Sequence, residues 1–141
     1  MKSKIQEYKE EFTEQIQKEK KIKQEINRLK KLCKDFDKEK IKTLEGLINE
    51  VAFLKVTLEY LRDDLLKNGL VELFEQGPNQ YNRERPEVKI YNSFFKSYSS
   101  TMKQLIDLLP KEEQKEETNA LMQFIARGKI KWHILKNITT K

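Results

Sequence analysis

The segment between Pro86 and Pro110 places the strongest constraint on how this chain folds. Large apolar side chains recur there at alternating steps of three and four, the spacing that lines one side of a helix. They are Val88, Tyr91, Phe95, Tyr98, Met102, Leu105 and Leu109. Proline is tolerated in a first helical turn, whereas just beyond a helix end it prevents continuation. The sequence therefore predicts a helix over 87–109 with an aromatic-rich face that must pack against another surface.

Composition favours a few long amphipathic helices over many short strands. Of the 141 residues, 37% are hydrophobic and 37% are charged, and the chain has only four glycines and three prolines with which to turn. This balance is typical of helices with charged outer faces and a thin core. The length suits one domain with extensions better than two independent cores. We therefore expect an all-α protein.

A long helix is also predicted over 38–68. Its apolar residues form a stripe wider than a coiled-coil seam, which indicates burial on more than one side. Asp35 or Asp37 can cap its start by accepting backbone N–H bonds. Gly69, after Asn68, supplies its end, because glycine accepts the left-handed conformation that helix ends often need.

Residues 3–34 predict a strongly charged N-terminal helix with an interrupted seam. Apolar residues share one heptad frame at both ends, whereas Gln15 and Glu19 occupy the positions between. Such a helix is either a coiled-coil arm or a mobile arm that docks only in its second half. Its outward face has the densest basic run of the chain: Lys18, Lys20, Lys21, Lys23, Arg28, Lys30, Lys31 and Lys34.

Residues 70–85 lack helical spacing. The apolar segment 70–74 and residues 80–82 flank a turn at 76–79, which predicts either a small β-hairpin over 70–82 or an irregular loop. A two-stranded ribbon is marginal alone, so a hairpin here would have to rest on a helix or on a neighbouring subunit.

The C-terminal part predicts a charged connector at 111–115 and a short helix. Thr118 is a candidate cap, and Gly128 a candidate end. The tail that follows alternates lysine with large apolar residues, and three conformations fit it: a strand, a short helix or a disordered docking peptide. Its tryptophan, Trp132, either anchors a partner or covers the protein's own core.

Charge is unevenly distributed. Residues 1–36 and 128–141 each sum to +4, and residues 37–127 sum to −2, which gives the total of +6. Basic ends can hold polyanions, because Lys and Arg displace the counterions of nucleic acids; the other interpretation is that they only keep the protein soluble. One cysteine, no apolar run of bilayer length and no signal-peptide h-region predict an intracellular protein without membrane association.

No catalytic constellation is present in the sequence. A zinc site needs several Cys or His ligands at short spacing, and the chain has only Cys33 and His133, far apart. The scattered glycines form no phosphate-binding loop. We therefore expect a protein that is not an enzyme and has no metal and no cofactor.

A series of motifs between residues 26 and 115 resembles the small subunit of phage terminases, in the branch found in phages of low-GC Gram-positive bacteria. The motifs are Leu58-x-x-Leu61, Asn68-Gly69, Glu75-Gln76-Gly77-x-Asn79-Gln80, Pro86, Tyr91-Asn92, Lys96-x-Tyr98 and Lys103-Gln104-Leu105-x-Asp107-Leu108-Leu109-Pro110. The resemblance implies a helical protein that forms a homo-oligomeric ring, recognises the packaging-initiation site of double-stranded viral DNA and delivers the DNA to a large ATPase and nuclease subunit. The location implied is the cytoplasm of an infected or lysogenic bacterial host.

With this resemblance, we assign three regions. Residues 1–36 are expected to contact DNA, through Lys20, Lys21, Lys23, Arg28, Lys30, Lys31 and Lys34. Residues 37–110 are expected to form an antiparallel helical hairpin that serves oligomerisation, through Leu54, Leu58, Leu61, Leu65, Tyr91, Phe95, Tyr98, Met102 and Leu105. Residues 111–141, a short helix and a basic tail, are expected to dock the large subunit, through Lys129, Lys131, Trp132 and Ile134. The competing hypothesis is a non-enzymatic helical scaffold or coiled-coil adaptor with solubilising basic ends.

Overall fold

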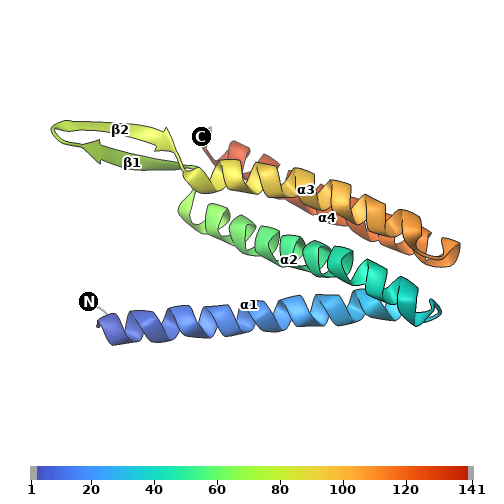
Figure 1. Ribbon diagram of the computed structural model, residues 1–141. Helices are drawn as coiled ribbons and strands as arrows, with labels where there is room; N and C mark the ends of the chain where they lie inside the picture. Colours follow the sequence, from blue (N-terminus) through green and yellow to red (C-terminus); the bar gives the residue numbers. More distant parts are fainter. Residues whose placement is uncertain (1–2, 140–141) are drawn as a thin grey trace.

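The computed structural model describes residues 3–139, and the side chains of residues 3–127. Within this range the elements are α1 (Lys4–Leu32), α2 (Lys38–Asn68), β1 (Val71–Gln76), β2 (Asn79–Glu84), α3 (Pro86–Leu108) and α4 (Lys111–Thr139). The helices run up and down along one long axis, and the β-hairpin projects from one end (Figure 1). The mainly helical fold with one small hairpin confirms the fold class expected from the sequence.

The centre of the fold is the antiparallel pair formed by α2 and α3, and its ends lie where the sequence predicted. Asp37 caps α2, because its side chain accepts a hydrogen bond of 2.7 Å from the Lys40 N–H. Gly69 ends α2 with a φ of 80°, a left-handed conformation that favours glycine. Pro86 opens α3, where its missing N–H costs no intrahelical bond.

The aromatic-rich face of α3 packs on α2 of the same chain. Most of the side chains assigned to oligomerisation are buried in this contact: Leu54, Leu58, Leu65, Tyr91, Tyr98, Met102 and Leu105. Leu61 and Phe95 are partly buried against the same core. The structure thus places all nine in the core of the single chain, so contacts with a second copy would need other side chains.

Arg62 is the one buried cation of this core within the described residues. It is 7% exposed, and its Nε donates a hydrogen bond of 2.7 Å to the Tyr91 hydroxyl. Its guanidinium also lies over the Phe124 ring, 4.0 Å from the centroid. A buried charge is costly unless it finds such partners. Arg62 therefore links α2 to both α3 and α4.

Only the second half of α1 docks on α2. Leu29 and Cys33 are fully buried there, whereas Ile5, Tyr8 and Phe12 are all more than 60% exposed. The first half nevertheless has a well-formed start, because Ser3 and Gln6 make a reciprocal capping box. The sequence predicted either a coiled-coil arm or an arm that docks only in its second half, and the structure agrees with the second interpretation.

Of the two alternatives for residues 70–82, the structure has the β-hairpin, and its strands extend to Glu84. The strands pair antiparallel, with Phe74 opposite Tyr81, and Gly77 takes a φ of 61° in the turn. The Phe74 and Tyr81 rings lie 5.5 Å apart with their planes tilted by 59°, and the Arg83 guanidinium lies over the Phe74 ring, 3.8 Å from its centroid. These contacts are within the hairpin itself.

The prediction for the C-terminal helix was wrong at both ends. Residues 111–115 form the first turn of α4 and not a connector, and the helix continues past Gly128 to Thr139. Glu112 and Glu113 favour a helix start, because acidic side chains stabilise the positive end of the helix dipole. A single glycine costs a helix only about 1 kcal/mol relative to alanine, so Gly128 alone does not end it.

Replacing Leu58 with alanine should destabilise the fold strongly. Leu58 is fully buried between α2 and its neighbours, and removing a buried leucine side chain costs roughly 2–5 kcal/mol. Chemical denaturation measures the free energy of unfolding. Met122→Ala, at a position that is 60% exposed, is the control and should change stability little; equal losses in both variants would contradict the proposed core.

Candidate nucleic-acid interface

The positive charge of the chain is concentrated between residues 18 and 42. This segment contains eleven lysines and arginines and five acidic residues, a net charge of +6 that equals the charge of the whole chain. It covers the docked half of α1, the turn at 33–37 and the start of α2. A concentrated positive field of this kind attracts polyanions.

Four of the lysines assigned to DNA share one exposed side of α1. Lys20, Lys23, Lys31 and Lys34 are exposed, and none of them forms an ion pair within the described residues. With 3.6 residues per turn, all four fall within roughly a quarter of the helix circumference, about half a turn away from the buried Leu29. Packing of α1 on α2 therefore turns these four ammonium groups toward solvent. We call them the basic face.

The other three assigned residues have contacts inside the protein. Lys21 lies over the Tyr60 ring at 5.2 Å, and Lys30 pairs with Glu45 at 3.4 Å. Arg28 is more strongly engaged, because its guanidinium contacts both Glu25 and Glu117 at 2.7 Å. The structure thus places Arg28 in an internal ion-pair network and away from the basic face.

Sequence reasoning missed two lysines beyond the turn. Lys38 and Lys42 are exposed in the first turns of α2, and Figure 1 shows that the start of α2 lies at the same end of the molecule as the end of α1. They were missed because the basic residues were sought within one helix, whereas the turn at 33–37 brings the end of α1 next to the start of α2. Counting net charge across the turn at 33–37, and not within one helix, would have identified both lysines.

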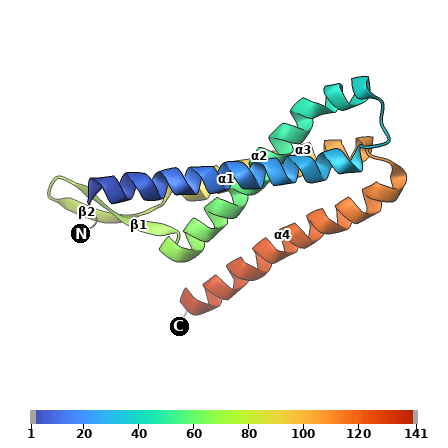
Figure 2. The same ribbon diagram turned by 90° about the horizontal axis from the view of Figure 1, so that it is seen from below.

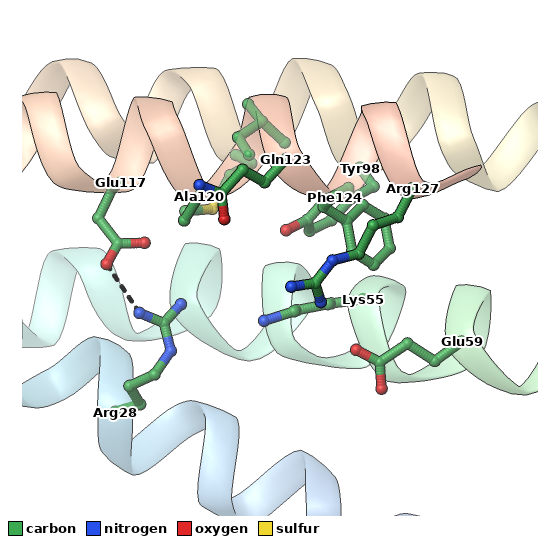
Figure 3. A pocket seen from close by; sticks show the side chains of 11 residues that line it. Arg28, Lys55, Glu59, Tyr98, Glu117, Ala120, Gln123, Phe124 and Arg127 are labelled. Atoms are coloured by element: carbon green, nitrogen blue, oxygen red, sulfur yellow. Dashed lines mark hydrogen bonds and ion pairs between the residues drawn. The ribbon is translucent and has the colours of Figure 1, made fainter. Parts of the chain in front are cut away.

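Beside this surface, a cleft of about 220 Å³ lies between α1, α2, α3 and α4. Figure 3 shows Arg28 reaching up from α1 to Glu117 on α4, with Lys55 of α2 and Arg127 of α4 beside them. Lys55 in turn pairs with Glu25 at 3.4 Å. One oxygen of Glu117, Oε2, is buried without a hydrogen-bond partner. The network joins α1 to α2 and to α4.

The network shifts the pKa of its members. Burial alone would raise the pKa of Glu25, but hydrogen bonds and charge from Arg28 and Lys55 outweigh burial, and the pKa of Glu25 is lowered. The pKa of Arg28 is raised, chiefly by its hydrogen bond to Glu25. Burial beside the same cleft raises the pKa of Tyr98. Glu25 and Arg28 are thus held in their charged forms, and Tyr98 in its neutral form.

No group of three or more His, Cys, Asp and Glu side chains that could hold a metal ion occurs in the part of the chain that the structure describes. Within the same part, no helix is both long and apolar enough to cross a membrane. The side chains of Lys129, Lys131, Trp132 and Ile134 lie outside the described residues, although the backbone there belongs to α4.

Comparisons with protein-family models, with curated proteins and with solved structures find no match for this chain.

The ion-pair network should make stability depend on pH in the acid range. The folded protein keeps Glu25 ionised to a lower pH than the unfolded chain, whose carboxylate has an ordinary pKa of 4.5. The stabilisation is therefore complete above pH 4.5 and is lost as the pH falls through the lower pKa of the folded state. Denaturation of the wild type and of Glu25→Gln across this range should show a difference in unfolding free energy that shrinks as the pH falls.

Glu50→Gln is the matched control for this experiment, because Glu50 is an exposed carboxylate on α2. The difference in unfolding free energy between Glu50→Gln and the wild type should stay nearly constant with pH. If the difference between Glu25→Gln and the wild type is equally independent of pH, that result would contradict the ion-pair network.

Proposed function

We propose that this protein binds double-stranded DNA through the basic face of α1, as the small subunit of a viral DNA-packaging terminase. The observation that supports DNA binding most directly is the set of four exposed lysines without ion pairs, on the side of α1 opposite its packed side. Lysines that are already solvated and unpaired can meet phosphates without breaking any contact of the fold. Binding is then driven largely by the release of counterions from DNA.

The spacing of these lysines suits a DNA backbone. Lys20 and Lys34 are fourteen residues apart, which spans about 21 Å of helix axis at 1.5 Å per residue. That length corresponds to roughly six base pairs of B-DNA. Phosphate contacts position a protein on DNA without reading bases, so recognition of a packaging site would use the shape or bending of the DNA.

The packaging role is supported by the resemblance of residues 26–115 to terminase small subunits. In this role several copies form a ring, hold the viral DNA at its packaging-initiation site and deliver it to the large ATPase and nuclease subunit. Residues 111–141, with Trp132 as the aromatic anchor, are the proposed docking segment for the large subunit. The protein would act in the cytoplasm of the bacterial host.

A helical scaffold or adaptor is the second candidate function, and one observation favours it. The first half of α1 exposes apolar side chains, with Ile5, Tyr8 and Phe12 each more than 60% exposed. Such a surface serves protein contacts whether or not DNA is bound. The two functions differ in what they require of the basic face, because a scaffold needs these lysines only for solubility.

Reversing the charge of the basic face should weaken DNA binding and its dependence on salt. The variant Lys20→Glu, Lys23→Glu, Lys31→Glu and Lys34→Glu removes four phosphate contacts, and each contact contributes about 0.9 to the slope of log K against log salt. The magnitude of that slope should therefore fall by roughly 3–4, with a loss of affinity at every salt concentration. Fluorescence anisotropy of a labelled duplex at several salt concentrations measures both quantities.

The matched control reverses four exposed lysines outside the basic face, Lys89, Lys96, Lys103 and Lys111. It has the same net charge as the first variant and should keep most of the salt slope. Circular dichroism confirms that both variants fold. Equal losses in the two variants, or no binding by the wild type at low salt, would favour the scaffold.

A further inference from the structure

The first half of α1 presents a continuous apolar strip that none of the described residues covers. Its side chains are Ile5, Tyr8, Phe12 and Ile16, with exposed fractions of 68%, 69%, 64% and 50%. Their spacing of three, four and four residues places them along one side of the helix. We call these four residues the α1 strip. Contiguous exposed apolar surface usually marks an interaction site.

Closing α1 onto α2 would not cover the α1 strip. In this half, Glu11, Gln15 and Lys18 line a hollow with Tyr60 of α2, so a polar side of α1 faces α2. Phe12 follows Glu11, and Ile16 follows Gln15, which places each about 100° around the helix from the polar side. The α1 strip therefore points to one flank, where none of the described residues buries it and a second molecule could.

The β-hairpin has a second uncovered apolar face. Val71 and Leu73 are 57% and 60% exposed and point to the same side, because alternate residues of a strand share a face. Glu75 lies on that face as well, and Glu84 joins it as the cross-strand partner of Val71. No helix packs extensively on the hairpin within the described residues. An isolated two-stranded ribbon is marginally stable, so a packing partner is expected.

The two surfaces match in polarity, and two lysines beside the α1 strip can meet two carboxylates of the hairpin face. The hairpin face has an apolar centre flanked by the carboxylates of Glu75 and Glu84. Two lysines border the α1 strip, Lys9 four residues after Ile5 and Lys4 four residues before Tyr8, and Glu11, three residues after Tyr8, borders it as well. Both lysines are exposed. Apolar contact in the centre and opposite charges at the rim are the features of a specific interface.

The arrangement of the molecule allows this contact only between copies. Figure 1 places the start of α1 and the hairpin at the same end of the long axis but on opposite sides of the molecule, and Figure 2 confirms that both project from that end. Copies lying side by side in one orientation would bring the hairpin of one against α1 of the next. A head-to-tail contact of this kind leaves each end copy with one free surface, and it forms a ring when the rotation closes.

We propose that the hairpin face of one copy packs on the α1 strip of a second copy, with Leu73 against Phe12 near the centre. The proposal rests on the oligomeric part of the function proposed above and identifies the surfaces that assemble. It does not depend on DNA, because neither surface contains the four lysines of the basic face.

Disulfide trapping between two single-cysteine variants tests this contact. The full-length Phe12→Cys and Leu73→Cys chains are mixed without DNA under mild oxidation, and non-reducing gels and mass spectrometry identify the products. The native Cys33 is fully buried, and burial raises its pKa, so the wild type serves as the unreactive control. The mixture should give a disulfide-linked dimer containing one chain of each variant.

Two results of the trapping experiment would overturn the proposal. One is a mixture with no mixed dimer, or with no more of it than of the dimer formed by either variant alone. The other is a single chain with both cysteines that closes an internal disulfide and stays monomeric, because the hairpin would then reach its own α1. A ladder of linked chains from this double variant supports the head-to-tail contact.

Self-association provides a second readout that does not need cysteine chemistry. Leu73→Glu should raise the dissociation constant of the oligomer at least about tenfold, because it removes one buried apolar side chain from the contact. Met122→Glu, at an equally exposed apolar position on α4, should leave it unchanged. Sedimentation at several concentrations measures both; a monomeric wild type, or equal effects of the two variants, would overturn the interface. Either result would leave the DNA binding of the basic face untouched, so the two proposals fail separately.

Discussion

The packing of α3 on α2 is the contact on which the rest of the structure depends. It buries the aromatic-rich face of α3, and it holds the cation Arg62 between the Tyr91 hydroxyl and the Phe124 ring. Once this pair is formed, α2 still has an uncovered side for α1, and α3 has one for α4. The Arg28, Glu25, Lys55 and Glu117 network then ties α1 and α4 to the centre. Helix α2, which is buried on more than one side, thus supports α1 directly and α4 through α3. Both α1 and α4 are charged on their outer sides.

This arrangement separates structural side chains from those available for function. The apolar residues whose spacing predicts a core pack against one another within the single chain. Recognition of partners must therefore use side chains that the core leaves exposed. On α1 the two kinds of exposed surface are divided along the helix: the first half has an exposed apolar strip, and the second half is strongly basic. The proposed functions follow this division, with assembly through the first half and DNA contact through the second.

The ends of the central helices were predictable because their signals are local, whereas the sequence left residues 70–82 open between a hairpin and an irregular loop. Pro86, Gly69 and Asp37 act through their own backbone and side-chain geometry, and the structure has each in its expected role. The end of the last helix was not predictable from Gly128, because one glycine costs less than neighbouring turns contribute. The pairing of Arg28 was hidden for another reason, since Glu117 is 89 residues away in the sequence. Periodicity likewise predicts that Tyr91 and Leu58 are buried but not whether the burying surface belongs to the same chain.

The central claim is that the basic face meets DNA, and lysine footprinting tests it most directly. The protein is acetylated briefly with and without a DNA duplex at low salt, and mass spectrometry measures modification at each lysine. The account predicts that the duplex protects Lys20, Lys23, Lys31 and Lys34, that high salt removes the protection, and that the exposed Lys89, Lys96 and Lys103 of α3 react equally in both samples. Protection of the α3 lysines instead, or of no lysine, would contradict it.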